Sequence, residues 1–153
     1  MNLYKRNKHN RSVGWSTWHF QWCTKYRYKI FSLEKDKKLC SIFLYEGAKR
    51  YGFEVLDLEV DVDHVHVLVS LPLSISPNDA IGLLKSYTSR CLFIELPKLN
   101  KIYPRGSLWS PGKFIGSIGH ITLEKAKNYI EEHHAKLLGF INGIQAPKGS
   151  AEG

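Results

Sequence analysis

Residues 61–69 constrain the fold of this chain more than any other segment, because their sequence, DVDHVHVLV, combines strand-forming residues with alternation. Side chains two residues apart in a β-strand point to the same face, so His64 and His66 share one face and the alternate valines share the other. The valine face predicts a hydrophobic core that would hold both imidazoles on a rigid sheet. Two such imidazoles suit a metal ion, but an isolated pair is more often two hydrogen-bonded strand residues without a chemical role.

The other segments predict a chain in which strands and helices alternate. We expect strands at 15–26, 53–60, 64–71 and 109–118, and helices at 34–51, from Ser76 onward and at 122–138. This order predicts an α+β fold, a ferredoxin-like or RRM-like βαββαβ sandwich with a four-stranded antiparallel sheet and an additional C-terminal helix. The histidine strand would lie in the middle of the sheet, and helices on one face would leave the other face open.

Length and composition predict one domain at 1–142 and a flexible, Gly-, Pro- and Ser-rich tail at 143–153. The three cysteines, Cys23, Cys40 and Cys91, are widely spaced in apolar segments, which favours core thiols over disulfides or a cysteine zinc site. Without a signal-like or membrane-length apolar stretch, we expect cytoplasmic localisation.

Two segments allow predictions about which side chains are buried. In the first strand, Trp18, Phe20 and Trp22 share one face, and His19, Gln21 and Cys23 share the other. The aromatic face suits either base stacking or packing under helices, and we favour the core. In the helix that begins at Ser76, the predicted buried stripe is Ala80, Leu84, Tyr87, Cys91 and Ile94, with Lys85 facing outward.

The net charge of +8 suits a polyanion, with nucleic acid favoured over a membrane surface. The last predicted helix adds a second candidate for chemistry. Tyr129 and His133 are four residues apart, so one helical face would present a phenol and an imidazole to the same place. An ordinary half-buried helix tyrosine is the better explanation of Tyr129 when that residue is considered alone.

Five motifs along the chain resemble one protein family when they are taken together. They are WHFQWCTKYR at 18–27, DHVH at 63–66, LLKS at 83–86, LWSPG at 108–112, and YI at 129–130. The chain resembles the small single-tyrosine transposases of the His-hydrophobic-His (HUH) nuclease superfamily, the insertion sequence 200/605 group, which move insertion sequences as single-stranded DNA.

The resemblance implies that His64 and His66 bind a divalent metal ion and that Tyr129 is the nucleophile. The family's third ligand is usually a glutamine four residues after the tyrosine, and this chain has His133 there. His133 keeps a donor atom at the right spacing. Asp61, Asp63, Glu132 and His134 remain alternatives for the third ligand.

These residue types suit cleavage and rejoining of DNA through a 5′-phosphotyrosine. A phenol with a pKa near about 10 is a poor nucleophile at neutral pH, and a cation offsets the charge of the phosphodiester. We expect Mg²⁺ or Mn²⁺ as the cofactor. A site with three imidazoles should also tolerate Zn²⁺.

For the substrate, basic residues near the sheet and the middle helix are candidates for phosphate contacts: Lys25, Arg27, Lys85, Arg90, Arg105 and Lys113. Each one alone is better explained by a solvated surface charge. The resemblance also implies recognition of a DNA hairpin and a homodimer in which the tyrosine helix of one subunit completes the histidine site of the other.

Two other functions are compatible with parts of the sequence. One is a related nuclease that serves another process, such as a domesticated transposase acting on chromosomal repeats, a replication initiator or a relaxase. The other is a non-catalytic RRM-like nucleic-acid-binding protein, because βαββαβ sheets bind RNA through exposed aromatics. Histidines on the central strand, followed by Tyr129 and His133, argue against this second function.

Overall fold

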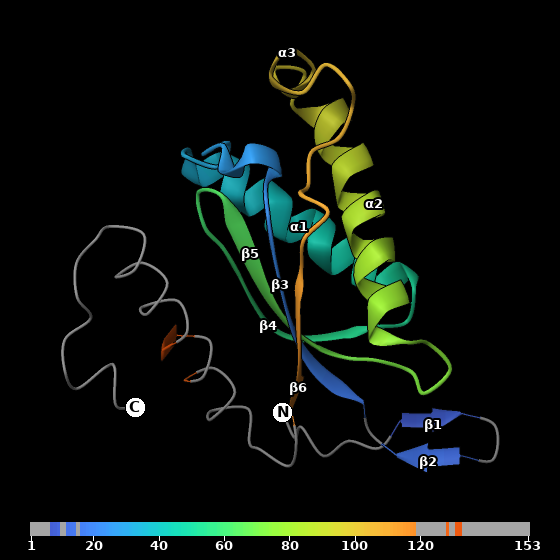
Figure 1. The fold of residues 1–153 in the computed structure, drawn as a ribbon. Helices are drawn as coiled ribbons and strands as arrows, with labels where there is room; N and C mark the ends of the chain where they lie inside the picture. Colours follow the sequence, from blue (N-terminus) through green and yellow to red (C-terminus); the bar gives the residue numbers. More distant parts are fainter. Residues whose placement is uncertain (1–6, 10–11, 15, 119–127, 129–130, 133–153) are drawn as a thin grey trace.

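The computed structural model describes residues 7–9, 12–14, 16–118, 128 and 131–132 (Figure 1). Its main sheet contains β3 (Thr17–Cys23), β4 (Glu54–Val60), β5 (His64–Ser70) and β6 (Phe114–Ile118) in the order β4-β5-β3-β6. Every neighbouring pair is antiparallel. The predicted four-stranded sheet is therefore confirmed, and the histidine strand β5 is central to it.

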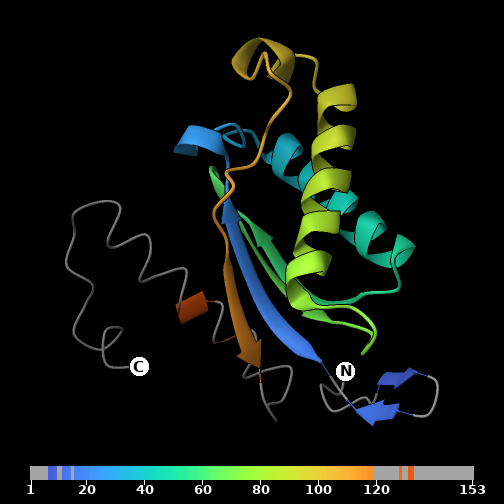
Figure 2. The ribbon, with the colours of Figure 1, turned by 45° about the vertical axis from the view of Figure 1, so that its right-hand side comes forward.

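Two long helices, α1 (Glu34–Arg50) and α2 (Pro77–Glu95), cover one face of this sheet (Figures 1 and 2). The core between the layers contains Phe20 and Trp22 from β3 and the valines of β5. The aromatic face of β3 therefore belongs to the core, as predicted, and does not form an open platform for stacking bases.

Local sequence explains where the helices begin and end. The Ser76 hydroxyl accepts a hydrogen bond from the Asp79 backbone N–H at 3.1 Å, and Pro77 occupies the first helical position of α2. Gly52 follows α1 with φ +76°, a left-handed conformation that glycine adopts without strain. The predicted start of α2 and the predicted end of α1 are confirmed.

The predicted buried stripe of α2 is wrong in part. Its buried residues are Ala80, Ile81, Leu84, Thr88 and Leu92, whereas Ile94 is 69% exposed and Tyr87 and Cys91 are only half-buried. The helix can bury Thr88 because its hydroxyl donates to the Leu84 carbonyl at 2.8 Å and accepts from Trp109 Nε1 at 3.0 Å. Thr88, whose hydroxyl is hydrogen-bonded, thus occupies a buried position of α2, in a stripe for which the prediction assumed apolar side chains.

Several shorter elements differ from the expected ones. Residues 109–118 form a strand only from Phe114, because Trp109 makes an isolated bridge with Thr24 before the Pro111–Gly112 interruption. The basic N-terminal segment includes a small hairpin, β1 (Asn7–His9) with β2 (Ser12–Gly14). A short helix, α3 (Leu99–Ile102), lies between Pro97 and Pro104, where the sequence predicts a loop, and a single 3₁₀ turn, η1 (Lys25–Arg27), follows β3.

The sheet face opposite α1 and α2 is not open at the histidines, contrary to the expectation from the sequence. His19, His64, His66 and Leu68 each expose 1% of their surface or less. The three cysteines are free thiols; Cys40 is fully buried, as predicted, whereas Cys23 and Cys91 are only half-buried and not core thiols. The imidazoles of His19, His64 and His66 therefore lie in a largely desolvated environment.

Candidate functional site

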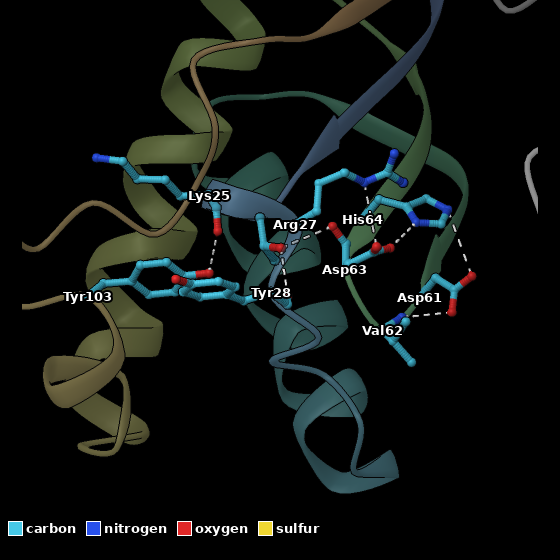
Figure 3. Close-up of polar contacts among 9 residues, drawn as sticks. Lys25, Arg27, Tyr28, Asp61, Val62, Asp63, His64 and Tyr103 are labelled. Atoms are coloured by element: carbon cyan, nitrogen blue, oxygen red, sulfur yellow. Dashed lines mark hydrogen bonds and ion pairs between the residues drawn. The ribbon is translucent and has the colours of Figure 1, made fainter. Parts of the chain in front are cut away.

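His64 is held by the aspartate that precedes it. Its Nδ1 lies 2.7 Å from Asp63 Oδ1, and because a carboxylate only accepts, the imidazole carries its proton on Nδ1 (Figure 3). Asp63 Oδ2 lies 3.5 Å from Nε of Arg27, so the carboxylate is engaged on both oxygens. In the neutral ring, Nε2 is therefore the basic nitrogen of His64.

Asp61 lies on the other side of the same imidazole. Its Oδ2 is 3.8 Å from His64 Nε2, while Oδ1 accepts a hydrogen bond from the Val62 backbone N–H at 2.7 Å (Figure 3). The turn between β4 and β5 therefore places one carboxylate at each ring nitrogen of His64. Of these two carboxylates, only that of Asp61 is near the nitrogen that is suited to a metal ion.

His66 has an imidazole partner that sequence reasoning did not include in the site. Its Nδ1 lies 3.1 Å from Nε2 of His19 on β3, and the two rings are stacked, with centroids 5.3 Å apart and planes at 18°. In the antiparallel register His19 pairs with Leu68, so it is a diagonal neighbour of His66 on the same face. Strand alternation places His19 opposite the aromatic face, and this was the signal available in the sequence.

The two predicted metal ligands lie side by side. The rings of His64 and His66 have centroids 5.0 Å apart and are nearly perpendicular, at 82°. Within the part of the chain that the structure describes, no group of three or more His, Cys, Asp or Glu side chains is arranged to hold a metal ion. A third ligand for a typical three-ligand site would have to come from outside the described residues or from a rearranged side chain.

The predicted nucleophile Tyr129 and the third-ligand candidates His133 and His134 lie outside the described residues. Glu132 is described, is helical and is exposed. The structure therefore describes the surroundings of His64 and His66, and their role as metal ligands stays a prediction, like the role of Tyr129 as the nucleophile.

A pocket of about 310 Å³ lies between β3 and the segment 110–114, and none of His19, His64 and His66 lines it. Two of its lining residues, Gln21 and Cys23, are the cross-strand partners of His66 and His64. Directly opposed residues of an antiparallel pair point to the same face, so two side chains that line this pocket share a sheet face with the imidazoles. Lys113 also lines it and brings a positive charge.

The other predicted DNA contacts have varied surroundings. Lys85 Nζ donates to the Ser110 carbonyl at 2.6 Å, and burial, reinforced by the charge of Lys113, lowers the Lys85 pKa. Lys85 is thus half-buried against the 110–114 segment and does not face outward as predicted. Arg90 is exposed beside the Tyr87 ring.

Lys25 and Arg105 line a second pocket, of about 330 Å³, and Arg27 remains 46% exposed beside Asp63. Three of the six predicted basic residues, Lys25, Arg105 and Lys113, therefore line pockets. No helix among the described residues is long and apolar enough to cross a membrane.

Comparison with known proteins identifies relatives of this chain. Residues 12–133 match the model of the family described as "Transposase IS200 like". The ISDra2 transposase TnpA of Deinococcus radiodurans is 34% identical over 119 residues, which cover 78% of this chain and 84% of that protein. The transposase for insertion sequence element IS200 of Salmonella typhimurium is 28% identical over 125 residues, or 79% of this chain and 81% of that protein.

Two solved structures share the fold. A crystal structure of a candidate transposase from Deinococcus radiodurans has a TM-score of 0.65 at 29% identity, covering 81% of this chain and 95% of that one. The structure of a REP-associated tyrosine transposase bound to a REP hairpin has a TM-score of 0.53 at 12% identity, covering 82% of this chain and 68% of that one. Sequence and fold agree, and the chain belongs to the IS200-like family of DNA transposases.

Proposed function

We propose that this transposase cleaves and rejoins single-stranded DNA through a 5′-phosphotyrosine on Tyr129, with a divalent metal ion held by His64 and His66. The observation that carries the proposal is that Nδ1 of each imidazole is engaged by a neighbouring side chain, Asp63 for His64 and His19 for His66. A metal-binding histidine typically uses its other ring nitrogen for such a hydrogen bond, which fixes the tautomer and orients the ring. When His66 donates to His19, Nε2 is the basic nitrogen in both rings.

The available donors fit a divalent ion. We propose His133 as the third ligand, with Asp61 as the alternative that the geometry supports, because its carboxylate lies near His64 Nε2. Asp63 is not proposed, since both of its oxygens are engaged at Nδ1 of His64 and at Arg27. A site with three imidazoles would use Mn²⁺ or Mg²⁺ and would also tolerate Zn²⁺. When bound, the ion supplies positive charge that polarises the scissile phosphate.

The bond changes balance without an external energy source. The Tyr129 phenol gives up its proton to solvent and its oxygen attacks phosphorus, the P–O3′ bond breaks, and the released 3′ oxygen takes up a proton. Attack by a 3′-hydroxyl on the phosphotyrosine reverses these steps and restores the phenol. One reaction, run in both directions, cuts and joins DNA.

We propose that the DNA strand passes through the pocket between β3 and the segment 110–114. Its lining combines the cationic Lys113 with the polar Gln21, which shares a sheet face with the imidazole pair, so a phosphate there would meet positive charge. That a protein of the same fold has been solved with a REP hairpin supports recognition of hairpin DNA by this chain also. We also propose a homodimer in which the tyrosine helix of one subunit completes the histidine site of the other.

The test is a covalent-adduct assay with the full chain, Mn²⁺ and labelled single-stranded hairpin DNA. We expect an adduct that Tyr129→Phe and His64→Ala both abolish and that a chelator prevents. We also expect His133→Gln to shift activity from Zn²⁺ towards Mg²⁺, because an amide oxygen suits the harder ion.

The outcomes that would overturn the proposal are equally concrete. An adduct that persists in Tyr129→Phe would assign the nucleophile elsewhere. A metal preference unchanged in His133→Gln would remove His133 as a ligand and favour Asp61. Tight, metal-independent RNA binding without any cleavage would instead indicate a non-catalytic binding protein.

A further inference from the structure

The turn that follows β3 holds an exposed aromatic ring in an unusual backbone conformation. Tyr26 and Arg27 both have left-handed φ values, 63° and 54°, which residues with bulky side chains rarely adopt. Tyr26 is 68% exposed in this turn. Such a conformation persists only where the surroundings impose it, and it concentrates at ligand-binding sites.

Hydrogen bonds from three directions impose this conformation. The Thr24 hydroxyl donates to the Tyr28 carbonyl at 2.7 Å, closing the turn on itself. The Tyr103 hydroxyl donates to the Lys25 carbonyl at 2.8 Å, and the Lys25 N–H donates to the Leu108 carbonyl at 2.8 Å (Figure 3). The turn is thus fixed before any ligand arrives.

Three tyrosine rings in contact form a row that runs from the interior to the surface. Tyr103 is 3% exposed, its ring stacks on Tyr28 with centroids 5.7 Å apart, and Tyr28 contacts Tyr26 at 5.4 Å. Lys25 Nζ lies 5.5 Å from the centroid of the Tyr26 ring. The buried ring anchors the two exposed rings, so little ordering is needed when a flat ligand stacks on them.

The pocket at this place is basic and aromatic. It measures about 330 Å³ and is lined by Lys25, Tyr26, Ile102, Tyr103, Pro104, Arg105 and Ser107. Two lining residues are cations and none is a carboxylate. An aromatic ring for stacking beside Lys and Arg for phosphates is the combination with which proteins bind single-stranded nucleic acid.

The same turn reaches the histidine site. Arg27 pairs with Asp63, and the Thr24 N–H donates to the Asp63 carbonyl at 2.8 Å, while Asp63 holds His64 (Figure 3). A strand bound at the pocket therefore lies close to the proposed cleavage site. Because a base in a duplex is already stacked on both faces, only an unpaired base can use the Tyr26 ring.

We propose that this pocket binds one unpaired nucleotide near the cleaved bond, with its base stacked on Tyr26 and its phosphate between Lys25 and Arg105. The proposal rests on the proposed function for its substrate class, single-stranded DNA. It assigns the pocket a positioning role, since it grips the strand while the histidine site acts on it.

The test measures binding without cleavage, so it can fail independently of the adduct assay. The full chain, in chelator, is titrated with labelled single-stranded oligo-dT of about 12 nucleotides and with an abasic chain of equal length. Tyr26→Asn removes the ring but suits a left-handed backbone, Tyr26→Phe keeps the ring, and Tyr45→Ala removes an exposed tyrosine of α1 as the matched control.

We expect Tyr26→Asn to weaken oligo-dT binding by about 5- to 150-fold, the range for one stacked base, and to leave binding of the abasic chain unchanged. Tyr26→Phe and Tyr45→Ala should bind like the wild type. An oligo-dT affinity unchanged in Tyr26→Asn would overturn the proposal. An equal loss of affinity for oligo-dT and for the abasic strand would also overturn it. A preference for duplex DNA that depends on Tyr26 would also overturn it and assign the pocket to the hairpin stem instead.

Discussion

At the residue scale, the histidine pair depends on side chains that are not themselves proposed as ligands. Asp63 fixes the tautomer of His64, and His19 occupies the corresponding nitrogen of His66. Both partners are buried, so their hydrogen bonds are shielded from competing water. If His64 and His66 bind the metal ion as proposed, each partner is a positioning residue, and replacing it should alter metal affinity without removing a ligand.

His19 provides the most direct test at this scale. Replacing His19 with Phe removes the partner of His66 Nδ1, and we expect Mn²⁺ affinity to fall by about 10- to 100-fold, the usual cost of losing an outer-shell partner. His19→Gln keeps a hydrogen-bonding group at the position of Nε2 and should retain most of the affinity. Calorimetric titration of the full chain measures both.

Thermal unfolding of the two His19 variants serves as the control for folding. If His19→Phe binds Mn²⁺ as tightly as the wild type while remaining folded, then His19 only fills space beside His66. The same result would weaken the assignment of Nε2 as the metal-binding nitrogen of His66.

At the element scale, the sheet register brings the histidines into one group, and the helix layer keeps the sheet rigid. β3 and β5 pair from Thr17 with Ser70 to Cys23 with His64, which aligns the ends of both strands. The helix layer depends on a close approach of α1 to α2 at Gly47. A Cβ there would lie 2.7 Å from Cδ1 of Tyr87, closer than side chains tolerate.

We therefore expect Gly47→Leu to lower the free energy of unfolding by about 1–3 kcal/mol, because the helices must separate or the Tyr87 ring must move. Gly82→Leu is the matched control, since Gly82 is an exposed glycine of α2 where an added Cβ would have no atom within 4 Å. It should be neutral, or stabilising by up to about 1 kcal/mol. Urea unfolding of both variants compares them, and equal losses would contradict the proposed helix contact.

At the scale of the whole molecule, the net charge of +8 and the basic pockets suit an enzyme that binds DNA. The proposed homodimer would determine how the active site is assembled. If the tyrosine helix of one subunit completes the histidine site of the other, two inactive variants can complement each other. Isologous dimers allow this exchange because both subunits present the same surface.

Mixing His64→Ala with Tyr129→Phe should accordingly restore adduct formation, because one of the two sites in each mixed dimer has intact histidines and an intact tyrosine. Either variant alone should form no adduct. Mixtures that stay inactive, although the subunits are shown to exchange, would mean that each subunit supplies its own tyrosine.

Much of the fold was predictable because local patterns determine it. The alternation of residues 61–69, the Ser76 cap and the glycine after α1 predicted a strand, the start of one helix and the end of another, and the structure confirms all three. The buried stripe of α2 was not predictable in the same way. Its burial of Thr88 depends on the indole of Trp109, which is 21 residues away in the chain.

The candidate site was likewise predictable only where local patterns determine it. The sequence by itself determined that His64 and His66 share one face of a strand, since side-chain direction alternates with a period of two. Only the tertiary structure decided that His19 joins them, that Asp63 and Asp61 lie at opposite nitrogens of His64, and that Tyr26 lines a basic pocket. These relations depend on strand register and on turn geometry, which bring together residues that no local pattern connects.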